Sequence, residues 1–200
     1  LHAWSSRWEM AETYQSAKEI LSVYENTEEE KAEQVQVLKK LWDAGFSVAA
    51  HQLGKCWRDG MGVLPDDKKA ELWFRRAAEA GHDFSQYALG KLLQSQKRME
   101  EAVSWYEKAA AQGNSYAAYR LGKLYLEGKD VPKNAARAVE YLTDAAQEGN
   151  QYAQYTLGKL YLTGKDVARD REQAYRWFWE SASQGNEYAQ FFLDHFNDNY

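Results

Sequence analysis

The amino-acid sequence repeats itself with a period of about 36 residues. Segments rich in aromatic and small residues end in a glycine at regular intervals, as in Trp73 to Gly81 (WFRRAAEAG) and Trp105 to Gly113 (WYEKAAAQG). A second series, Leu-Gly-Lys, keeps the same step and begins at Leu53, Leu89, Leu121 and Leu157. A period of this length indicates a stacked architecture, because each unit can bury its apolar face only against its neighbours.

Each repeat predicts two helices. Ala117, Leu121 and Leu124 recur at the spacing of one helix face, and no segment alternates with the period of a strand. Glycine turns are expected at Gly60, Gly128 and Gly164, with N-caps of the second helices at Asp66, Asn134 and Asp170. The glycine inside each Leu-Gly pair costs about 1 kcal/mol relative to alanine in a helix. We therefore expect a neighbouring helix to approach closely at these glycines.

The repeated residues resemble a known family. The pattern Ala-x-x-x-Leu-Gly-x-Leu-Tyr-x-x-Gly-x-x-Val, followed by Asp/Asn-x-x-x-Ala-x-x-Trp/Tyr and Ala-Ala-x-x-Gly-Asn, is similar to the Sel1-like repeat, a relative of the tetratricopeptide repeat. It covers residues 47–200, although the unit from Asp83 to Asn114 lacks the Gly-x-x-Val turn. Residues 1–46 match loosely, and Thr27 to Glu30 resemble a capping box that opens a second helix.

The resemblance implies an all-α fold, a right-handed α-solenoid of stacked antiparallel helix pairs. First helices would line the concave face and second helices the convex face. We see no linker and expect a single helical-repeat domain over residues 1–200. Its expected parts are a degenerate first unit or N-terminal cap at 1–46, repeats at 47–82, 83–114, 115–150 and 151–186, and a C-terminal capping helix at 187–200.

Few residues suggest chemistry. The histidines show no metal-ligand spacing, no glycine-rich phosphate loop follows a strand, and Cys56 takes a position that leucines fill in other repeats. We therefore expect a protein that is not an enzyme, with no catalytic residues, no metal and no cofactor. No apolar stretch approaches the roughly 20 residues of a membrane-spanning helix. These features, with a lone cysteine and no visible signal peptide, predict a cytoplasmic protein without a membrane role, although the start at Leu1 leaves an upstream signal or domain open.

One face of the first helices carries aromatic residues beside lysines. Residues at positions i, i+3 and i+7 of a helix share one face. The candidate partner-binding residues at these positions are Lys55, Tyr87, Lys91, Tyr116, Tyr119, Lys123, Tyr152, Tyr155 and Lys159. Val48, His51, Phe84, Tyr188, Phe191 and His195 complete the pattern. Aromatic rings can clamp a peptide and ammonium groups can pair with carboxylates. The tyrosines could instead fill the crevice between successive first helices, and the lysines could be a solvated face.

These residues predict a non-enzymatic scaffold or adaptor that binds an extended or helical segment of another protein, preferably acidic, on the concave face. One alternative is the adaptor tail of a larger bacterial enzyme or of an envelope or conjugation machine. Single-stranded nucleic-acid binding is disfavoured, because acidic residues outnumber basic ones 30 to 25 and the net charge is −5. Homo-oligomers through the ends of the array are also possible.

Overall fold

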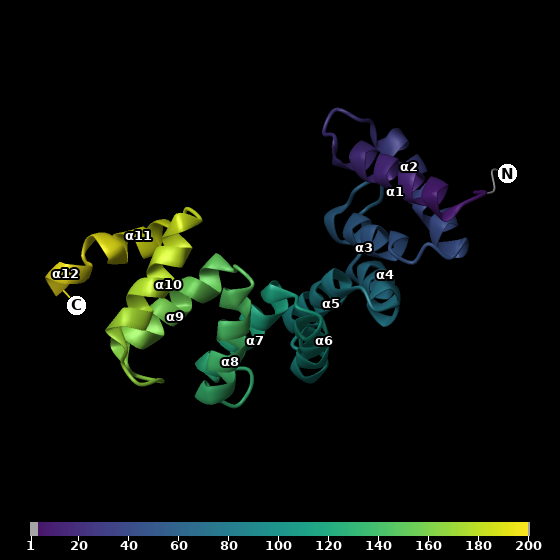
Figure 1. Cartoon of the computed structure of the whole chain (residues 1–200). Helices are drawn as coiled ribbons and strands as arrows, with labels where there is room; N and C mark the ends of the chain where they lie inside the picture. The colour runs from purple at the N-terminus through teal and green to yellow at the C-terminus, as the bar shows by residue number, and fades with distance from the viewer. Residues whose placement is uncertain (1–3, 200) are drawn as a thin grey trace. The chain divides into compact units, whose positions relative to one another are not determined.

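The computed structural model describes residues 4–199, and these residues form α-helices without strands. The helices of the first half are α1 (Arg7–Ser22), α2 (Glu28–Asp43), α3 (Ala49–Asp59), α4 (Asp67–Glu79) and α5 (Asp83–Ser95). Those of the second half are α6 (Met99–Ala111), α7 (Ser115–Glu127), α8 (Ala135–Gln147), α9 (Gln151–Thr163), α10 (Arg171–Ser183), α11 (Glu187–Asp194) and α12 (Phe196–Asn199). Helices α1 to α5 contact their neighbours in sequence, as in α3 with α4, and so do helices α6 to α12, as in α9 with α10 (Figure 1).

The chain divides into two compact units between α5 and α6. Unit 1 comprises Leu1–Lys97 and unit 2 comprises Arg98–Tyr200. Within each unit, successive helices form stacked antiparallel pairs, so the predicted all-α solenoid class is confirmed (Figure 1). The sequence shows no linker at this division, and the single-domain assignment of residues 1–200 stays a prediction.

Polar caps set the helix boundaries where the sequence predicts them. The Asp66 carboxylate accepts hydrogen bonds from the backbone N–H groups of Lys68 and Lys69, at 3.0 and 3.1 Å. Asn134 and Asp170 cap α8 and α10 in the same way. The capping box is also present, because the side chains of Thr27 and Glu30 each accept a hydrogen bond from the backbone N–H of the other residue. The glycine turns adopt the left-handed conformation, with φ of 75°, 66° and 68° at Gly60, Gly128 and Gly164.

The mid-helix glycines lie where second helices approach first helices closely. A Cβ atom on Gly54 would lie 2.5 Å from Cδ1 of Phe74, and one on Gly158 would lie 2.7 Å from the same atom of Phe178. At Gly122 the obstructing atom is Cγ of Leu142, 2.6 Å away. The predicted close approach is therefore confirmed at these three glycines, where any larger residue would push the paired helices apart.

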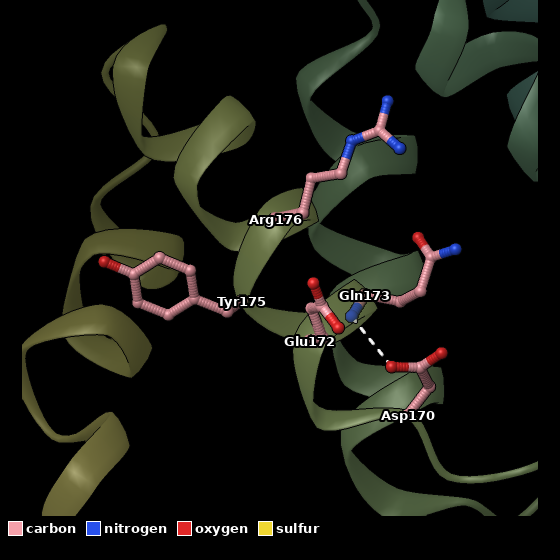
Figure 2. Close-up of a pocket in the computed structure, with 5 residues that line it drawn as sticks. All are labelled: Asp170, Glu172, Gln173, Tyr175 and Arg176. Carbon is pink, nitrogen blue, oxygen red and sulfur yellow. Dashed lines mark hydrogen bonds between the residues drawn. The ribbon is translucent and has the colours of Figure 1, made fainter.

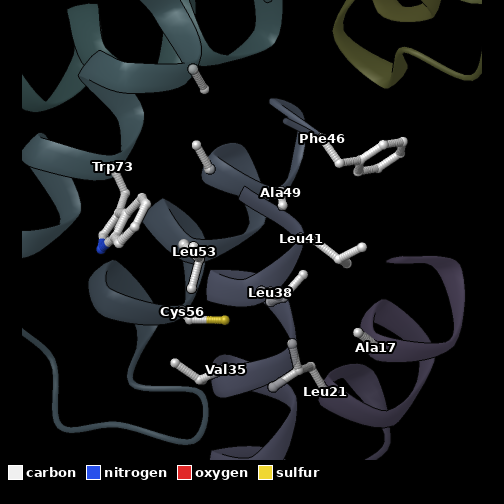
Figure 3. Close-up of a cluster of buried hydrophobic side chains, with 12 residues drawn as sticks. Ala17, Leu21, Val35, Leu38, Leu41, Phe46, Ala49, Leu53, Cys56 and Trp73 are labelled. Atoms are coloured by element: carbon white, nitrogen blue, oxygen red, sulfur yellow. The ribbon is translucent and has the colours of Figure 1, made fainter. Parts of the chain in front are cut away.

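Small and branched apolar residues form the core of each unit. In unit 1 the buried cluster runs from Ala17 and Leu21 through Leu38 and Leu53 to Trp73 (Figure 3). Cys56 belongs to this cluster and is fully buried, and burial raises the pKa of its thiol to about 12. The thiol is therefore a packing group at neutral pH, as its position among leucines in the repeat predicts.

The core of unit 2 uses larger rings towards its C-terminal end. Leu142 and Leu157 are among its fully buried residues, and Phe178 of α10 stacks on Phe192 of α11 with ring centroids 4.7 Å apart. Among residues 4–199, no helix combines the length and apolar character needed to cross a bilayer.

Candidate functional site

In each unit, the exposed sides of the first helices carry the residues that the sequence singles out, and we call this surface the first-helix face of that unit. In unit 1 it comprises outward-facing residues of α3 and α5, and in unit 2 those of α7, α9 and α11. In unit 2 the outer aromatic residues are open to solvent: Tyr116, Tyr152 and Tyr188 are 51, 54 and 74% exposed. The inner residues Tyr119 and Tyr155 are partly buried. The two aromatic positions of each repeat therefore have different environments.

The inner tyrosines bridge successive first helices of unit 2. The Tyr119 ring on α7 lies 6.1 Å from the Tyr152 ring on α9, and the Tyr155 ring lies 6.0 Å from the Tyr188 ring on α11. Tyr155 also contacts Phe178 and Phe192, and burial raises the pKa of its hydroxyl. The inner rings thus make the packing contacts that the alternative interpretation predicts, while the outer rings keep open surface.

The lysines of unit 2 lie close to one another. The Lys159 ammonium lies 4.6 Å from the centroid of the Tyr155 ring, in a cation–π contact. Burial and the neighbouring charge of Lys123 lower the pKa of Lys159. Lys123 pairs with Glu127 at 3.5 Å, whereas no carboxylate of the described residues pairs with Lys159. Of these two cations only Lys123 has a carboxylate partner, an arrangement that favours the approach of an anion to Lys159.

The corresponding lysines of unit 1 act on a carboxylate that pairs with an arginine. Arg58 Nε lies 2.8 Å from the Asp59 carboxylate. The pKa of Asp59 is lowered first by its hydrogen bond from Arg58 and further by the charges of Arg58, Lys55 and Lys91. Lys91 also lies over the ring of Tyr87, 5.2 Å from its centroid. This part of the face therefore carries more positive than negative charge, with Asp59 held by Arg58.

His51 occupies the inner aromatic position of α3 but points into the structure. Its Nδ1 lies 2.7 Å from the hydroxyl of Ser85 on α5, and its ring lies 5.7 Å from that of Phe74. Burial, followed by the charges of Lys55 and Arg58 among others, lowers its pKa to about 4. His51 is therefore neutral at physiological pH and joins two first helices through a hydrogen bond.

Three hollows lie on or beside these elements. One of about 350 Å³ lies between α1 and α3, with Lys18, Lys55 and Asp59 among its lining residues. One of about 180 Å³ lies at the start of α7 and α9, lined by Ser115, Tyr116, Glu148, Gly149, Asn150, Gln151, Tyr152 and Gln184. The third, of about 520 Å³, lies beside the first turns of α10.

The hollow beside α10 contains none of the predicted site residues. Figure 2 shows Tyr175 and Arg176 pointing in different directions, while the Asp170 carboxylate accepts the N-cap hydrogen bond from the Gln173 backbone. Its side chains do not converge on one point, and Asp170 is committed to its helix. The hollow next to Tyr116 and Tyr152 joins the first-helix face of unit 2, and the hollow between α1 and α3 includes Lys55 of unit 1.

The sequence reasoning missed the counterions of the lysines. Asp59 and Glu127 lie four residues after Lys55 and Lys123, and Thr163 takes the same place after Lys159. Acids four residues from lysines on a helix are a visible signal of pairing. Lys91 is followed by Ser95 in the same place, so this signal separates Lys91 and Lys159 from Lys55 and Lys123.

Four stretches of the chain, residues 47–82, 84–114, 115–150 and 151–186, match the family model described as Sel1 repeat. A Sel1 repeat protein from Oxalobacter formigenes is 32% identical, with a TM-score of 0.79 over 90% of this chain and 75% of that one. A protective antigen with an SLR fold from uropathogenic Escherichia coli is 28% identical, with a TM-score of 0.56 over 94% of this chain and 48% of that one.

Helicobacter pylori cysteine rich protein B is 27% identical, with a TM-score of 0.54 over 64% of this chain and 96% of that one. No curated protein matches the sequence significantly. Proteins of the Sel1-repeat fold are typically protein-interaction scaffolds. The repeat period, the glycine seams and the matching family model agree, and the chain belongs to the Sel1 repeat family.

Proposed function

We propose that this protein is a non-enzymatic adaptor that binds an acidic segment of a partner protein on the first-helix face, through its lysines and tyrosines. The observation that carries the proposal is the pair Lys123 and Lys159 in unit 2. Their ammonium groups lie close enough for Lys123 to lower the pKa of Lys159, and Lys159 rests on the Tyr155 ring instead of on a carboxylate. A carboxylate from a partner would relieve this repulsion.

The distribution of charge supports an acidic partner. Helices α7 and α9 carry three basic residues, Arg120, Lys123 and Lys159, and one acidic residue, Glu127. The whole chain has a net charge of −5. Positive charge thus predominates on α7 and α9 of a chain that is acidic overall, whereas α11 carries Glu187 and Asp194 and no basic residue. Such segregation accelerates the encounter with an acidic partner and disfavours partners that carry positive charge.

The open tyrosines supply contact area beside these charges. Tyr152 is 54% exposed, although a tyrosine in a core would be covered. Tyrosine presents a large rigid ring at a low cost in conformational entropy, which makes it a frequent anchor at protein interfaces. Lysine charge and tyrosine surface on one face suit a peptide better than a small molecule or a nucleic acid.

Cross-linking from this face tests the proposal. A photoreactive phenylalanine analogue would replace Tyr152, and in a second protein Tyr175 of α10, in cells of the source organism. We expect the first position to cross-link a partner through an acidic segment, and the variant Lys91→Glu, Lys123→Glu, Lys159→Glu to lose that cross-link. The matched control is Lys40→Glu, Lys129→Glu, Lys165→Glu, which changes the charge equally at exposed lysines elsewhere. Equal cross-linking by both triple variants would reject the proposal.

A further inference from the structure

The inner aromatic residue of α11 is uncovered, unlike its equivalents on the preceding first helices of unit 2. The inner ring of α9, Tyr155, lies 6.0 Å from the ring of Tyr188 on α11 and is partly buried. Phe191 holds the inner position of α11, and its side chain is 56% exposed. Within the part of the chain that the structure describes, no first helix follows α11, since α12 has four residues. The Phe191 ring is therefore open where its equivalents meet a neighbouring helix.

Two carboxylates flank this open ring. Glu187 and Asp194 lie four residues before and three residues after Phe191, which places all three on one face of α11. Both acidic side chains are exposed, and Asp194 accepts a hydrogen bond from the side-chain amide of Gln190 at 2.9 Å. Residues 187–199 contain no lysine or arginine. An apolar ring with negative charge on both sides suits a partner surface that is apolar and basic.

The repeats before α11 show how a helix covers such a ring. Tyr188 of α11 makes the contact with Tyr155, and the next residue, Ala189, is fully buried. Helix α9 presents the same pair, Tyr152 and the fully buried Ala153, towards α7. A small residue after the ring lets the covering helix approach closely. A helix with an aromatic residue followed by a small one could therefore cover Phe191 in the same way.

The open ring can also receive a cation. In α5 and α9 a lysine four residues after the inner tyrosine lies over its ring, as Lys159 does over Tyr155 at 4.6 Å. The equivalent residue of α11 is His195, whose ring lies 4.3 Å from that of Phe191. A lysine or arginine of a partner can contact the exposed part of the Phe191 ring and pair with the acids beside it.

A second copy of this chain is a poorer occupant. Two α11 helices facing each other would bring Glu187 and Asp194 of one copy against the same acids of the other, and like charges oppose binding. The hollow of about 370 Å³ on α1 and α2 is no better match, because Glu9 and Glu12 are among its lining residues. Charge therefore favours a basic partner over self-association.

We propose that α11 binds a basic amphipathic helix of a partner protein at Phe191. The partner helix sets an aromatic residue and the small residue after it against the Phe191 ring, while its lysines or arginines pair with Glu187 and Asp194. This inference goes beyond the proposed function and does not depend on it. A chain with both sites would hold together two partners of opposite charge.

Stapled helical peptides test the inference by fluorescence anisotropy with the whole chain. The probe is an alanine-based helix of about sixteen residues, with a Tyr-Ala pair at its centre and lysines four residues before and three residues after the tyrosine. It is stapled because isolated helices of this length are marginal in water. One control peptide has glutamates in place of the lysines, and another has serine in place of the tyrosine. We expect the probe to bind about tenfold more tightly than either control.

Variants of the chain locate the binding site. Phe191→Ser should weaken binding of the probe about tenfold, whereas Phe84→Ser, at a phenylalanine of equal exposure on α5, should leave it unchanged. Asp194→Lys should remove the preference for the basic peptide over the acidic one. Asp130→Lys, the same change at an exposed residue between α7 and α8, should preserve that preference. Circular dichroism checks that all four variants keep the helix content of the parent chain.

The other outcomes overturn the inference without deciding the proposed function. Equal binding of the basic and the acidic peptide would reject a basic partner, and undiminished binding by Phe191→Ser would reject this site. Sedimentation velocity tests the second copy, and we expect a single species at all concentrations. A dimer that Phe191→Ser dissociates would assign this surface to self-association instead. Cross-linking through Tyr152 tests the proposed function separately, because it reports on an acidic partner.

Discussion

The two units share one framework but differ in the surface it displays. In both, a mid-helix glycine of a first helix receives a phenylalanine from the second helix, Gly54 with Phe74 in unit 1 and Gly158 with Phe178 in unit 2. The lysines on the exposed side differ in their surroundings. In unit 1 the charges of Lys55 and Lys91 act on the Asp59 carboxylate, which pairs with Arg58, whereas in unit 2 the charge of Lys123 acts on Lys159.

The difference shows how a repeat protein separates stability from recognition. Residues at the seam between paired helices are constrained by packing, so the same close approach of the helices limits their size in every repeat. Residues on the exposed side are constrained only by solvation and by whatever binds there. At equivalent positions of successive repeats, the difference between Glu127 and Thr163 leaves Lys159 without the carboxylate that pairs with Lys123. Adjacent repeats can thus keep one fold while only one of them attracts an anion.

Truncating the seam should have the largest effect and should affect both units alike. Phe74→Ala and Phe178→Ala each remove a fully buried ring. We expect each to lower the free energy of unfolding by about 3–5 kcal/mol, measured by urea denaturation. Hydrogen exchange should locate the loss in the unit that carries the change. Leu64→Ala, at an 85% exposed residue, is the control and should have little effect. A loss of less than about 1 kcal/mol at either ring would contradict the shared framework.

Lowering the pH should destabilise unit 1 through His51. The equivalent positions in α7 and α9 of unit 2 carry tyrosines, Tyr119 and Tyr155. Burial holds the pKa of His51 at about 4 in the folded chain, below its ordinary value of 6.5. As pH falls from 6.5 to 4, the unfolded chain takes up a proton that the folded chain does not, so stability decreases. The expected loss is about 3 kcal/mol.

The variant His51→Gln isolates this effect, because an amide can keep a hydrogen bond to Ser85 but does not titrate. Chemical denaturation of the two proteins between pH 7 and pH 4 gives the difference in slope, and contributions from other groups cancel. We expect a shallower decline for the variant. Parallel curves would mean that His51 does not set the acid sensitivity.

The turn of the short repeat offers a smaller test. Lys97, between α5 and α6, is the non-glycine residue with positive φ among the described residues, at 63°. The left-handed conformation costs a residue with a Cβ atom about 1–2 kcal/mol. Glycine avoids this cost, but it loses more conformational entropy on folding, which offsets part of the gain. We therefore expect Lys97→Gly to raise the free energy of unfolding by about 0.5–1 kcal/mol.

The long-loop repeats provide the matched variant for this turn. Gly128 has φ of 66°, and a Cβ there would lie 2.5 Å from Cβ of Lys133. Gly128→Ala should therefore destabilise the protein, the opposite sign to Lys97→Gly. Thermal unfolding of the two variants beside the parent chain measures both. A decrease in stability for Lys97→Gly would show that its side chain makes contacts that outweigh the backbone strain.

The smallest expected effect comes from exchanging the counterions of the two units. Thr163→Glu would give Lys159 the carboxylate that Lys123 has in Glu127, and should weaken binding of a flexible acidic peptide, (Glu-Gly-Gly)4, by about two- to threefold. Asp59→Asn would remove the carboxylate that pairs with Arg58 and on which Lys55 and Lys91 act, and should strengthen binding of the same peptide. Titrations at low and high salt measure both changes, since only the charge-dependent part is screened. Unchanged affinity for both variants would show that the internal acids do not set the difference between the units.

The helices and their ends could be predicted from local signals, because such signals act within a few residues. Asp66, Asn134 and Asp170 cap the helices they were expected to cap, and the glycine turns take the left-handed conformation. His82 is an exception, since it stands at an N-cap without a side-chain hydrogen bond where other repeats use asparagine. The candidate site was predictable as a stripe of residue types, though its binding role stays a prediction.

The sequence by itself determined the repeat period, the two-helix unit, the caps and the glycine seams, because each depends on backbone geometry and on contacts repeated in every unit. Only the tertiary structure decided that Lys159 rests on the Tyr155 ring, that His51 turns inward to Ser85, and that the chain divides after Lys97. These features depend on side chains that are distant in sequence meeting in space. Burial and neighbouring charges there set protonation and pairing, and a linear pattern does not contain those distances.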